Sequence, residues 1–330
     1  MADDGDDDVF VYTGGEQEVP LDVRHVIIDR SVNIIREGAF YQRVALLTFE
    51  MHDGIEIIER DAFSSCVSIR RLKMLGVREV GKFAFFNCKL LTDVQFDDKL
   101  EIIRESAFIY CKSLQKIRLP SVRTIKYGAF EDCDQLRDVE LPDVERIYKY
   151  AFIRCFALRR IAIPLKENML PLDHNERYTH LPDDQYRYTQ FDYCGNLTTV
   201  DLVGGIHKSI SSLLLDCWRD EVNQEINRIN QVLPNTDANE KTWVIREWIQ
   251  TILGKMEHYR NEHRVLLKEA TTLLELAMWK AKLDKNEDCS IEGRAEKAKF
   301  DTAGARKERR ITPGANVVIR NVLPFLQLDE

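Results

Sequence analysis

The stretch that decides the fold is Ile125-Lys126-Tyr127-Gly128-Ala129-Phe130-Glu131-Asp132-Cys133. Its Ala-Phe pair occurs six times in the chain, with the aromatic residue at Phe40, Phe63, Phe85, Phe108, Phe130 and Phe152. Successive markers stand 23, 22, 23, 22 and 22 positions apart, and a seventh marker, Phe191, lacks the Ala. A fixed period of this length is typical of a repeat array in which each unit stacks on the next.

Each marker lies in a fixed pattern of apolar residues. A Cys follows the Phe by three positions in every unit but the first, which has Arg43; the cysteines are Cys66, Cys88, Cys111, Cys133, Cys155 and Cys194. Apolar residues recur six, nine and eleven positions after the Phe, as at Leu114, Ile117 and Leu119. The alternation of the last two predicts a short strand with one buried face. The spacing of three from Phe to Cys predicts about one and a half turns of helix.

This pattern resembles the BspA-like class of leucine-rich repeats over about residues 23–205, because some nine positions recur in seven units. The resemblance implies an α/β fold, a curved parallel solenoid of about seven repeats that are each 22 or 23 positions long, and a binding role. The pattern departs once, between Phe152 and Phe191. These two markers stand 39 positions apart, which indicates an insertion of about seventeen positions within 165–190.

A helical, coiled-coil-like module is expected after the repeats. Two glycines at 204–205 end the last repeat, and apolar residues then follow a helical stripe over 209–233. Pro234 stops this helix, and a second is expected over 240–283. Its apolar seam alternates by four and three, the coiled-coil period, through Ile245, Ile249, Ile252, Met256, Tyr259, His263, Leu266, Ala270, Leu273, Ala277 and Lys280. The short connection favours an antiparallel hairpin.

The domain boundaries follow from these elements. An acidic tail and N-terminal cap occupy 1–20, the solenoid 21–205 and the hairpin 206–283. A charged linker, 284–312, precedes an apolar C-terminal segment, 313–330, which we expect to pack on the hairpin.

The charge distribution excludes several partners. The net charge is −8, and residues 206–330 hold 20 basic and 20 acidic residues, so the excess lies in the repeats and the Asp-rich start. No domain is basic enough to bind nucleic acid through its phosphates, and no run of 18 apolar residues is present to span a membrane. Residues 1–8 lack the features of a secretory signal. We therefore expect an intracellular, cytoplasmic protein, with nuclear import left open by the basic cluster Arg306–Arg310.

The cysteines predict buried free thiols. Six of the eight occupy one repeat position, and the chain has no C-x-x-C pair of the kind that zinc sites use. Cys behaves as a small hydrophobic residue in protein cores. A metal or disulfide role is the less favoured alternative, and we expect no cofactor.

Charged side chains mark the exposed positions of the predicted strands. These positions are Arg71, Lys73, Asp93, Gln95, Lys116, Arg118, Asp138, Glu140, Arg160 and Ala162. The sign of the charge alternates from unit to unit, and equivalent positions in stacked strands lie about 4.8 Å apart. Each charge should therefore face its opposite across the concave face. Two interpretations remain: a ladder that fixes the stacking, or a surface for docking a partner.

The insertion is the second candidate for partner binding. Arg177, Tyr178, Tyr186 and Tyr188 lie in it, and Tyr and Arg are favoured as interface anchors. Insertions in repeat proteins often form loops at the binding face. A solvated loop without a role is the alternative.

No nucleophile–base set, paired-carboxylate site or cofactor loop stands out. We therefore expect a non-enzymatic protein–protein interaction module or scaffold that binds through the concave face and the insertion. The alternatives are a structural homo-oligomer built through the long heptad helix and an enzyme that uses the polar insertion. Tyr259, His263 and Ala270 are poor dimer-core residues beside Leu or Ile, so we expect mainly a monomer.

Overall fold

A computed structural model describes most of the chain. The described residues are 9–15, 17–171, 189–203 and 215–292. The chain divides into two compact units: residues 1–206 with 221–253, and residues 207–220 with 254–330. The first unit holds the repeats and parts of two helices, and it contains the candidate site.

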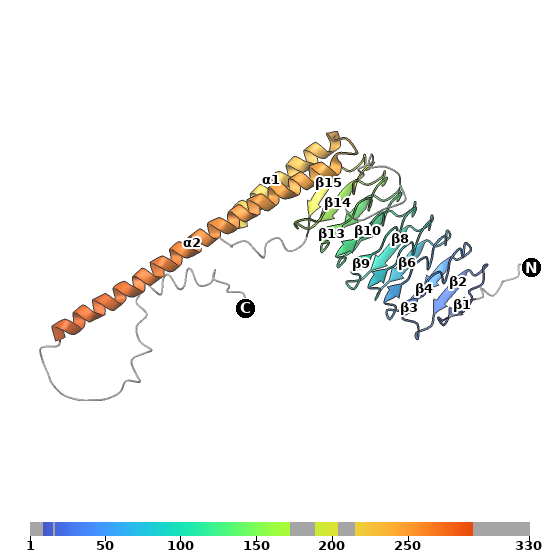
Figure 1. Cartoon of the computed structure of the whole chain (residues 1–330), viewed down its shortest axis with the longest axis horizontal. Helices are drawn as coiled ribbons and strands as arrows, with labels where there is room; N and C mark the ends of the chain where they lie inside the picture. The colour runs from blue at the N-terminus through green and yellow to red at the C-terminus, as the bar shows by residue number, and fades with distance from the viewer. Residues whose placement is uncertain (1–8, 16, 172–188, 204–214, 293–330) are drawn as a thin grey trace, which may run out of the picture. The chain divides into compact units, whose positions relative to one another are not determined.

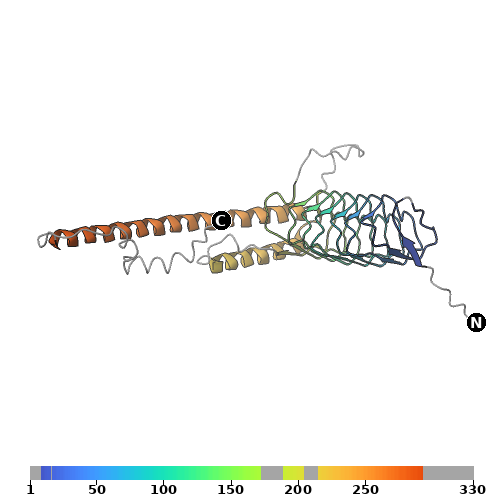
Figure 2. The same cartoon turned by 90° about the horizontal axis from the view of Figure 1, so that it is seen from below.

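The repeats contain a column of longer strands and a column of shorter strands. The longer strands are β1 (Val9–Tyr12), β2 (His25–Ile28), β4 (Thr48–Glu50), β6 (Arg71–Met74), β8 (Asp93–Phe96), β10 (Lys116–Arg118), β12 (Asp138–Glu140), β14 (Arg160–Ile163) and β15 (Thr199–Leu202). The shorter strands are β3 (Ile34–Ile35), β5 (Ile57–Ile58), β7 (Glu79–Val80), β9 (Ile102–Ile103), β11 (Thr124–Ile125) and β13 (Arg146–Ile147). Every strand pair is parallel, and the coils follow one another as a stack (Figures 1 and 2). The predicted parallel solenoid is confirmed.

The Ala-Phe-x-x-Cys run forms turns, so the prediction of a short helix there is wrong. In each of the six coils from Phe40 to Phe152, two residues have positive φ, one placed two positions before the Phe and one two positions after it; around Phe191 only the second, Tyr193, does. Around Phe108 these are Ser106, with φ 54°, and Tyr110, with φ 62°. A left-handed residue cannot continue a right-handed helix. The backbone turns instead, and the side chains of Phe108 and Cys111 are both fully buried.

The seven Phe markers form one column through the core. All are fully buried, and from Phe40 to Phe191 successive ring centroids lie 5.0, 5.2, 5.0, 5.3, 5.3 and 5.7 Å apart, with the rings stacked. The backbone N–H of each of the first six markers, Phe40 to Phe152, also bonds to the next coil, as in Phe108 to the carbonyl of Ala129 at 2.8 Å. Each coil therefore satisfies a buried polar group of its neighbour.

The cysteines form a second column beside the first. The Sγ of Cys133 donates to the carbonyl of Phe108, in the preceding coil, at 3.2 Å. The same bond recurs at 3.0–3.2 Å from Cys66, Cys88, Cys111, Cys155 and Cys194. The thiol is a weak donor, so this column adds packing and a small polar contact at every step.

The N-terminal end of the stack has its own closing contacts. Arg43 stands where the other coils have Cys, and its guanidinium donates to the carbonyl of Val19 at 2.6 and 3.0 Å. Tyr12 of β1 is buried, and its ring centroid lies 5.0 Å from that of Phe40. The segment before the first marker therefore covers the end of the Phe column.

Two helices follow the repeats, α1 (Leu215–Val232) and α2 (Lys241–Glu292), joined through the short helix η2 (Leu233–Asn235). They run antiparallel: the indole N–H of Trp248 donates to the carbonyl of Glu225 at 3.0 Å. α2 continues past the predicted end at residue 283 into the segment expected to be a linker. Neither Gly nor Pro occurs between that position and Gly293, and the intervening residues tolerate a helix.

The helical residues of the first unit close the last coil. The N–H of Phe191 has no next coil to reach, and it donates to Thr242 Oγ1 at 3.0 Å. The Asn230 amide accepts from the N–H of Val200 at 2.8 Å and donates to the carbonyl of Val200 at 3.3 Å. A side-chain amide thus takes the place of a neighbouring strand at the edge of β15.

Lys241 completes this closure. Its side chain is fully buried, and its Nζ donates to the carbonyls of Gly195 and Leu197 at 2.8 and 2.6 Å. Burial lowers the pKa of Lys241 from its ordinary value. The two carbonyls offset part of the cost of burying this group.

The insertion is narrower than the predicted 165–190. The carbonyl of Met169 accepts from the N–H of Ile147 at 2.8 Å, as in an ordinary coil. Gln190 is fully buried, and its amide donates to the carbonyl of Ile147 at 3.0 Å. Both ends of the predicted segment therefore belong to the stack, and the rest, 172–188, lies outside the described residues.

Truncating the middle of the Phe column should be costly. We expect Phe108→Ala to lower the free energy of unfolding by roughly 3–5 kcal/mol, because it leaves a cavity between two stacked rings. Urea denaturation measures this change. Phe156→Ala is the control, because that ring is 49% exposed; equal effects of the two variants would show that Phe108 does not support the core.

Removing the side chain that pairs with β15 tests the closure. Asn230→Ala deletes both hydrogen bonds to Val200, and we expect it to lower the free energy of unfolding by about 1–3 kcal/mol. The exposed Asn227 of the same helix is the matched control. The closure is contradicted if thermal unfolding of Asn230→Ala and Asn227→Ala is the same.

Candidate functional site

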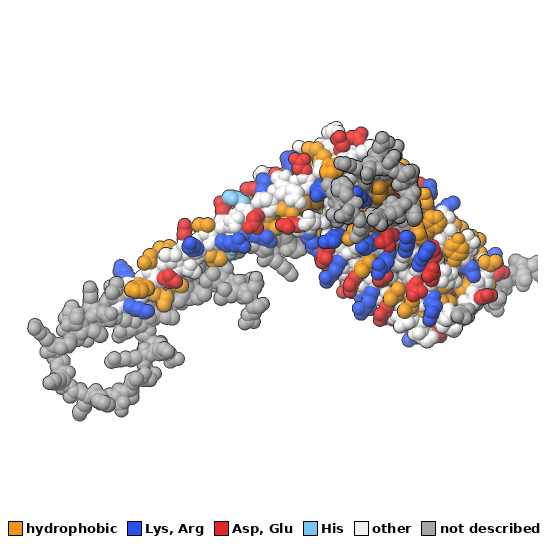
Figure 3. Space-filling view, in the orientation of Figure 1, with side chains coloured by type: hydrophobic (Ala, Val, Ile, Leu, Met, Phe, Trp, Pro, Cys, Tyr) orange, Lys and Arg blue, Asp and Glu red, His pale blue; other side chains and the backbone are white. Residues whose placement is uncertain are grey.

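The outward side chains of β6, β8, β10, β12 and β14 form a surface that we call the strand face. Eight of the residues predicted from sequence lie on it: Arg71, Lys73, Asp93, Lys116, Arg118, Asp138, Glu140 and Arg160. Strand register places opposite charges side by side, as in Arg71 beside Asp93 and Asp138 beside Arg160. Figure 3 shows basic and acidic side chains alternating over the repeats. The sequence pattern therefore corresponds to neighbouring positions in space.

Only part of this ladder forms ion pairs. Arg160 contacts Asp138 at 2.8 Å and also pairs with Asp201, and Arg118 lies 3.2 Å from Glu140. Burial acts to lower the pKa of Arg160, but its hydrogen bonds to the two carboxylates outweigh this and raise it. Such half-exposed pairs contribute only about 0.2–1 kcal/mol each. They help to align the coils rather than hold them together.

The other cations of the strand face are available for contacts outside the chain. Within the described ranges, Arg71, Lys73 and Lys116 form no ion pair, although Arg71 and Lys116 lie in register with acidic residues. All three side chains are exposed. The ion pairs of the strand face therefore lie toward β14, whereas the cations of β6 form none. The sequence pattern did not indicate this difference.

The sheet of longer strands is interrupted at two places. Its described strands form three groups, β1-β2-β4, β6-β8 and β10-β12-β14-β15. The shorter strands β3 to β13 remain one continuous sheet. The interruptions between β4 and β6 and between β8 and β10 therefore affect one side of the stack only.

The two interruptions fall at longer steps between the Phe markers. Both coincide with the longer step of 23 positions, from Phe40 to Phe63 and from Phe85 to Phe108, whereas the three shorter steps of 22 positions join paired strands. The extra residue lies after the strand, in the links ending at Ile55 and Leu100. The longer step does not by itself prevent pairing, because β2 and β4 pair across 23 positions, His25 with Thr48.

A groove of about 590 Å³ lies at the interruption between β8 and β10. Its apolar wall is made by Leu75, Phe96 and Pro120, and its polar wall includes Lys116. The other lining residues are Asp93, Val94, Gln95, Ile117, Arg118, Asp138 and Glu140. Five of the predicted partner-binding residues therefore surround one cavity. The groove itself was not predicted from the sequence, and the longer repeat step at this place only coincides with it.

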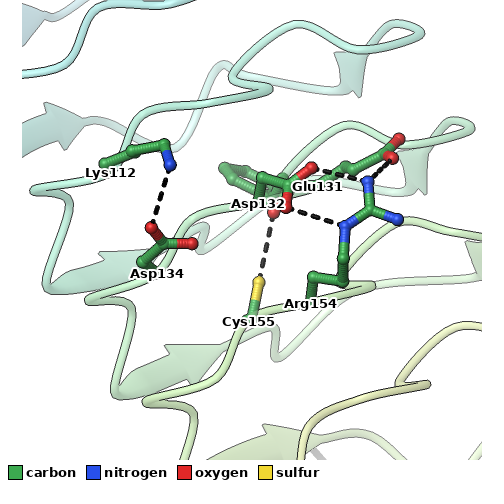
Figure 4. Close-up of polar contacts among 7 residues, drawn as sticks. Lys112, Glu131, Asp132, Asp134, Arg154 and Cys155 are labelled. Carbon is green, nitrogen blue, oxygen red and sulfur yellow. Dashed lines mark hydrogen bonds and ion pairs between the residues drawn. The ribbon is translucent and has the colours of Figure 1, made fainter.

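A second polar cluster lies on the turns of two adjacent coils (Figure 4). Arg154 donates from Nε and Nη2 to the two oxygens of Asp132 at 2.8 and 2.6 Å, and it also pairs with Glu131. Burial raises the pKa of Glu131. The guanidinium of Arg154 already pairs with two carboxylates of the preceding coil, so this cluster links neighbouring coils. This cluster could not be predicted from the sequence, because the residue two positions after the Phe differs from coil to coil.

The thiol column offers no reactive site. Cys66 through Cys194 are fully buried and free of disulfides, so the prediction of buried thiols is confirmed. Burial raises the pKa of Cys66 and of Cys194 to about 12, and it raises the pKa of the four between them well above 9.0. A thiol needs its thiolate form to act as a nucleophile or metal ligand. Over the described ranges, no group of three His, Cys, Asp or Glu residues is arranged to hold a metal ion.

Several predicted features lie outside the described residues. These are Arg177, Tyr178, Tyr186 and Tyr188 of the insertion, the basic cluster 306–310, and the C-terminal segment 313–330. Among the helices that the structure describes, none combines the length and apolar character needed to cross a bilayer.

Comparison with known families agrees with this architecture. Residues 21–121 and 71–169 match the BspA type leucine rich repeat region, with six copies. Residues 21–169 therefore carry leucine-rich repeats of the BspA type. A search of curated proteins found no relative.

Solved structures of bacterial proteins are also similar to the chain. A leucine rich cell surface protein from Faecalibacterium prausnitzii is 18% identical, with a TM-score of 0.35, over 55% of each chain. The T. pallidum Leucine Rich Repeat protein is 26% identical, with a TM-score of 0.37, over 54% of this chain and 81% of that one. A leucine-rich repeat protein from Bacteroides ovatus is 17% identical, with a TM-score of 0.32, over 56% and 57%. The chain thus spans about half the length of the first and third proteins.

Thiol reactivity tests the burial of the Cys column. Burial raises the pKa of Cys66 from 9.0 to about 12, so its thiolate fraction at pH 8 should be about a thousandfold lower in the folded chain than in the unfolded one. We expect maleimide to label the six column cysteines slowly at pH 8 in buffer and rapidly in 8 M urea, as read by mass spectrometry of each peptide. Rapid labelling of all six in buffer would contradict the burial.

Proposed function

We propose that this chain is a non-enzymatic interaction module that binds a protein partner through the strand face, centred on the groove between β8 and β10. One observation carries the proposal: the strand face contains a groove at an interruption of its sheet, and five of the residues predicted to contact a partner line this groove. An interface needs an apolar anchor site and polar groups around it. Phe96 and Pro120 supply the first, and Lys116 and Asp138 supply the second.

The charges of the groove define the chemistry of the partner. Acidic and basic residues both line it, so the best complement is a protein surface that also carries both signs. Such alternation selects among partners by penalising like charges in the wrong register. Asp93, Asp138 and Glu140 in the lining would repel a polyanion. For this reason we do not propose nucleic acid as the ligand.

The insertion is the second part of the proposed surface. It leaves the stack after Pro171 and returns at Thr189, between the coils of β14 and β15. Its Tyr and Arg residues are of the kinds that anchor interfaces. We propose that they extend the contact beyond the groove, in an intracellular setting.

Charge reversal on the strand face tests the proposal. Immobilised full-length chain captures proteins from a native lysate, and the captured proteins are identified by mass spectrometry. We expect Lys116→Glu with Arg118→Glu to reduce a specific captured protein by about tenfold or more. Arg78→Glu with Arg123→Glu is the matched control, because these exposed arginines flank the shorter strands β7 and β11.

Two results would overturn this function. One is a captured protein that both double variants retain equally. The other is a partner that crosslinks only to lysines away from Lys73 and Lys116. Deleting only residues 172–188 then separates the contribution of the insertion from that of the groove, because the buried Gln190 and Met169 stay in place.

A further inference from the structure

The distal part of α2 exposes an apolar stripe. Val265, Leu266, Leu273, Leu276 and Trp279 have exposed fractions of 56%, 44%, 63%, 60% and 67%. At 100° per residue these five positions fall within an arc of about 140° on one side of the helix. Large apolar side chains that gather on one face at this exposure mark a surface that is covered in the working protein.

α1 does not reach this stripe. In the unit that holds both residues, the rings of Trp218 and Tyr259 lie 5.8 Å apart. Trp218 is in the first turn of α1, whereas α2 continues well beyond Tyr259, to Glu292. Among the described residues, α1 is the only other α-helix. The stripe begins at Val265, more than one helical turn past Tyr259, so the described part of α1 leaves it uncovered.

We propose that the chain's own C-terminal segment, 313–330, covers the stripe by folding back along α2. This segment lies outside the described residues, and its apolar residues include Val317, Val318, Ile319, Val322, Leu323, Phe325 and Leu326. The stripe lies about 20–40 Å before the end of α2 along the helix axis, at about 1.5 Å per residue. Residues 293–312 span up to roughly 70 Å when extended, so the connection is long enough.

The charges before and after the C-terminal end of α2 favour a chain that folds back along the helix. Residues 284–292 hold four acidic residues and one basic residue, and the C-terminal end of a helix is also the negative end of its dipole. Residues 294–310 hold seven basic and three acidic residues. A chain that turns back after Glu292 brings the basic span alongside the acidic end. A second copy packed in parallel would instead place the acidic ends together.

Covalent connection also favours the chain's own segment over a second copy. A tethered segment is present at an effective concentration of about millimolar, whatever the protein concentration. A modest apolar contact is therefore enough to hold it. A second copy has to bind from solution, and the small Ala270 and Ala277 of the adjoining seam give it a weak core.

Photo-crosslinking of the full-length chain tests the contact directly. A photo-reactive phenylalanine analogue replaces Leu273, which is exposed, so the fold should not depend on it. We expect crosslinks within one chain to peptides of residues 313–330. The control is the same analogue in place of Thr271, on the opposite side of the helix, which should give at least fivefold fewer of these crosslinks. Crosslinks between chains, or none to 313–330, would overturn the proposal.

Deletion of residues 313–330 gives a second readout, by light scattering at micromolar concentration. We expect the full chain to be monomeric and the deletion variant to self-associate through its uncovered stripe. Leu273→Asp in the deletion variant should restore the monomer, and Thr271→Asp should not. A full-length dimer that Leu273→Asp dissociates, with no effect of the deletion, would assign the stripe to a second copy. These outcomes do not depend on whether the strand face binds a protein partner.

Discussion

Every coil of this solenoid relies on its neighbour to satisfy the polar backbone groups that it buries. The N–H of each Phe marker from Phe40 to Phe152 donates to a carbonyl of the next coil, and the thiol of each column Cys donates to the carbonyl of a Phe in the coil before. These bonds lie beside stacked rings that exclude water. Because the inner columns fix the stack, the outer side chains are free to differ from coil to coil, and this freedom allows a specific surface on a repetitive frame.

The same constraint explains how the C-terminal end of the array is closed. A last coil without a neighbour would leave a Phe N–H and a strand edge unpaired, and exposed edges promote aggregation. Thr242, Lys241 and Asn230 supply side-chain atoms where a further coil would supply backbone. The helices therefore close the end of the solenoid. The distal part of α2 makes none of these closing contacts, and it carries the exposed apolar stripe.

Much of the fold could be predicted from the sequence, because the regular period of the Phe markers determines the stack and its buried columns. The turns could not, since the left-handed positions beside Phe108 are Ser106 and Tyr110 rather than the Gly that usually marks such backbone. The candidate residues of the strand face were predictable from the alternating charges. The groove was not, because steps of 23 positions occur both where strands pair, as in β2 and β4, and where they do not, as in β8 and β10. The pairing of Asn230 with Val200 is a contact between distant segments with no sequence pattern of its own.

Native-state hydrogen exchange tests the central claim most directly. The amides of Phe63, Phe85, Phe108 and Phe130 all donate to the next coil at 2.8 Å. If these bonds hold the stack, the four amides exchange together, at the rate set by unfolding of the array, and far more slowly than the amide of the exposed Asp98. Exchange of the four Phe amides at the rate of Asp98, in a chain that is otherwise folded, would contradict the account.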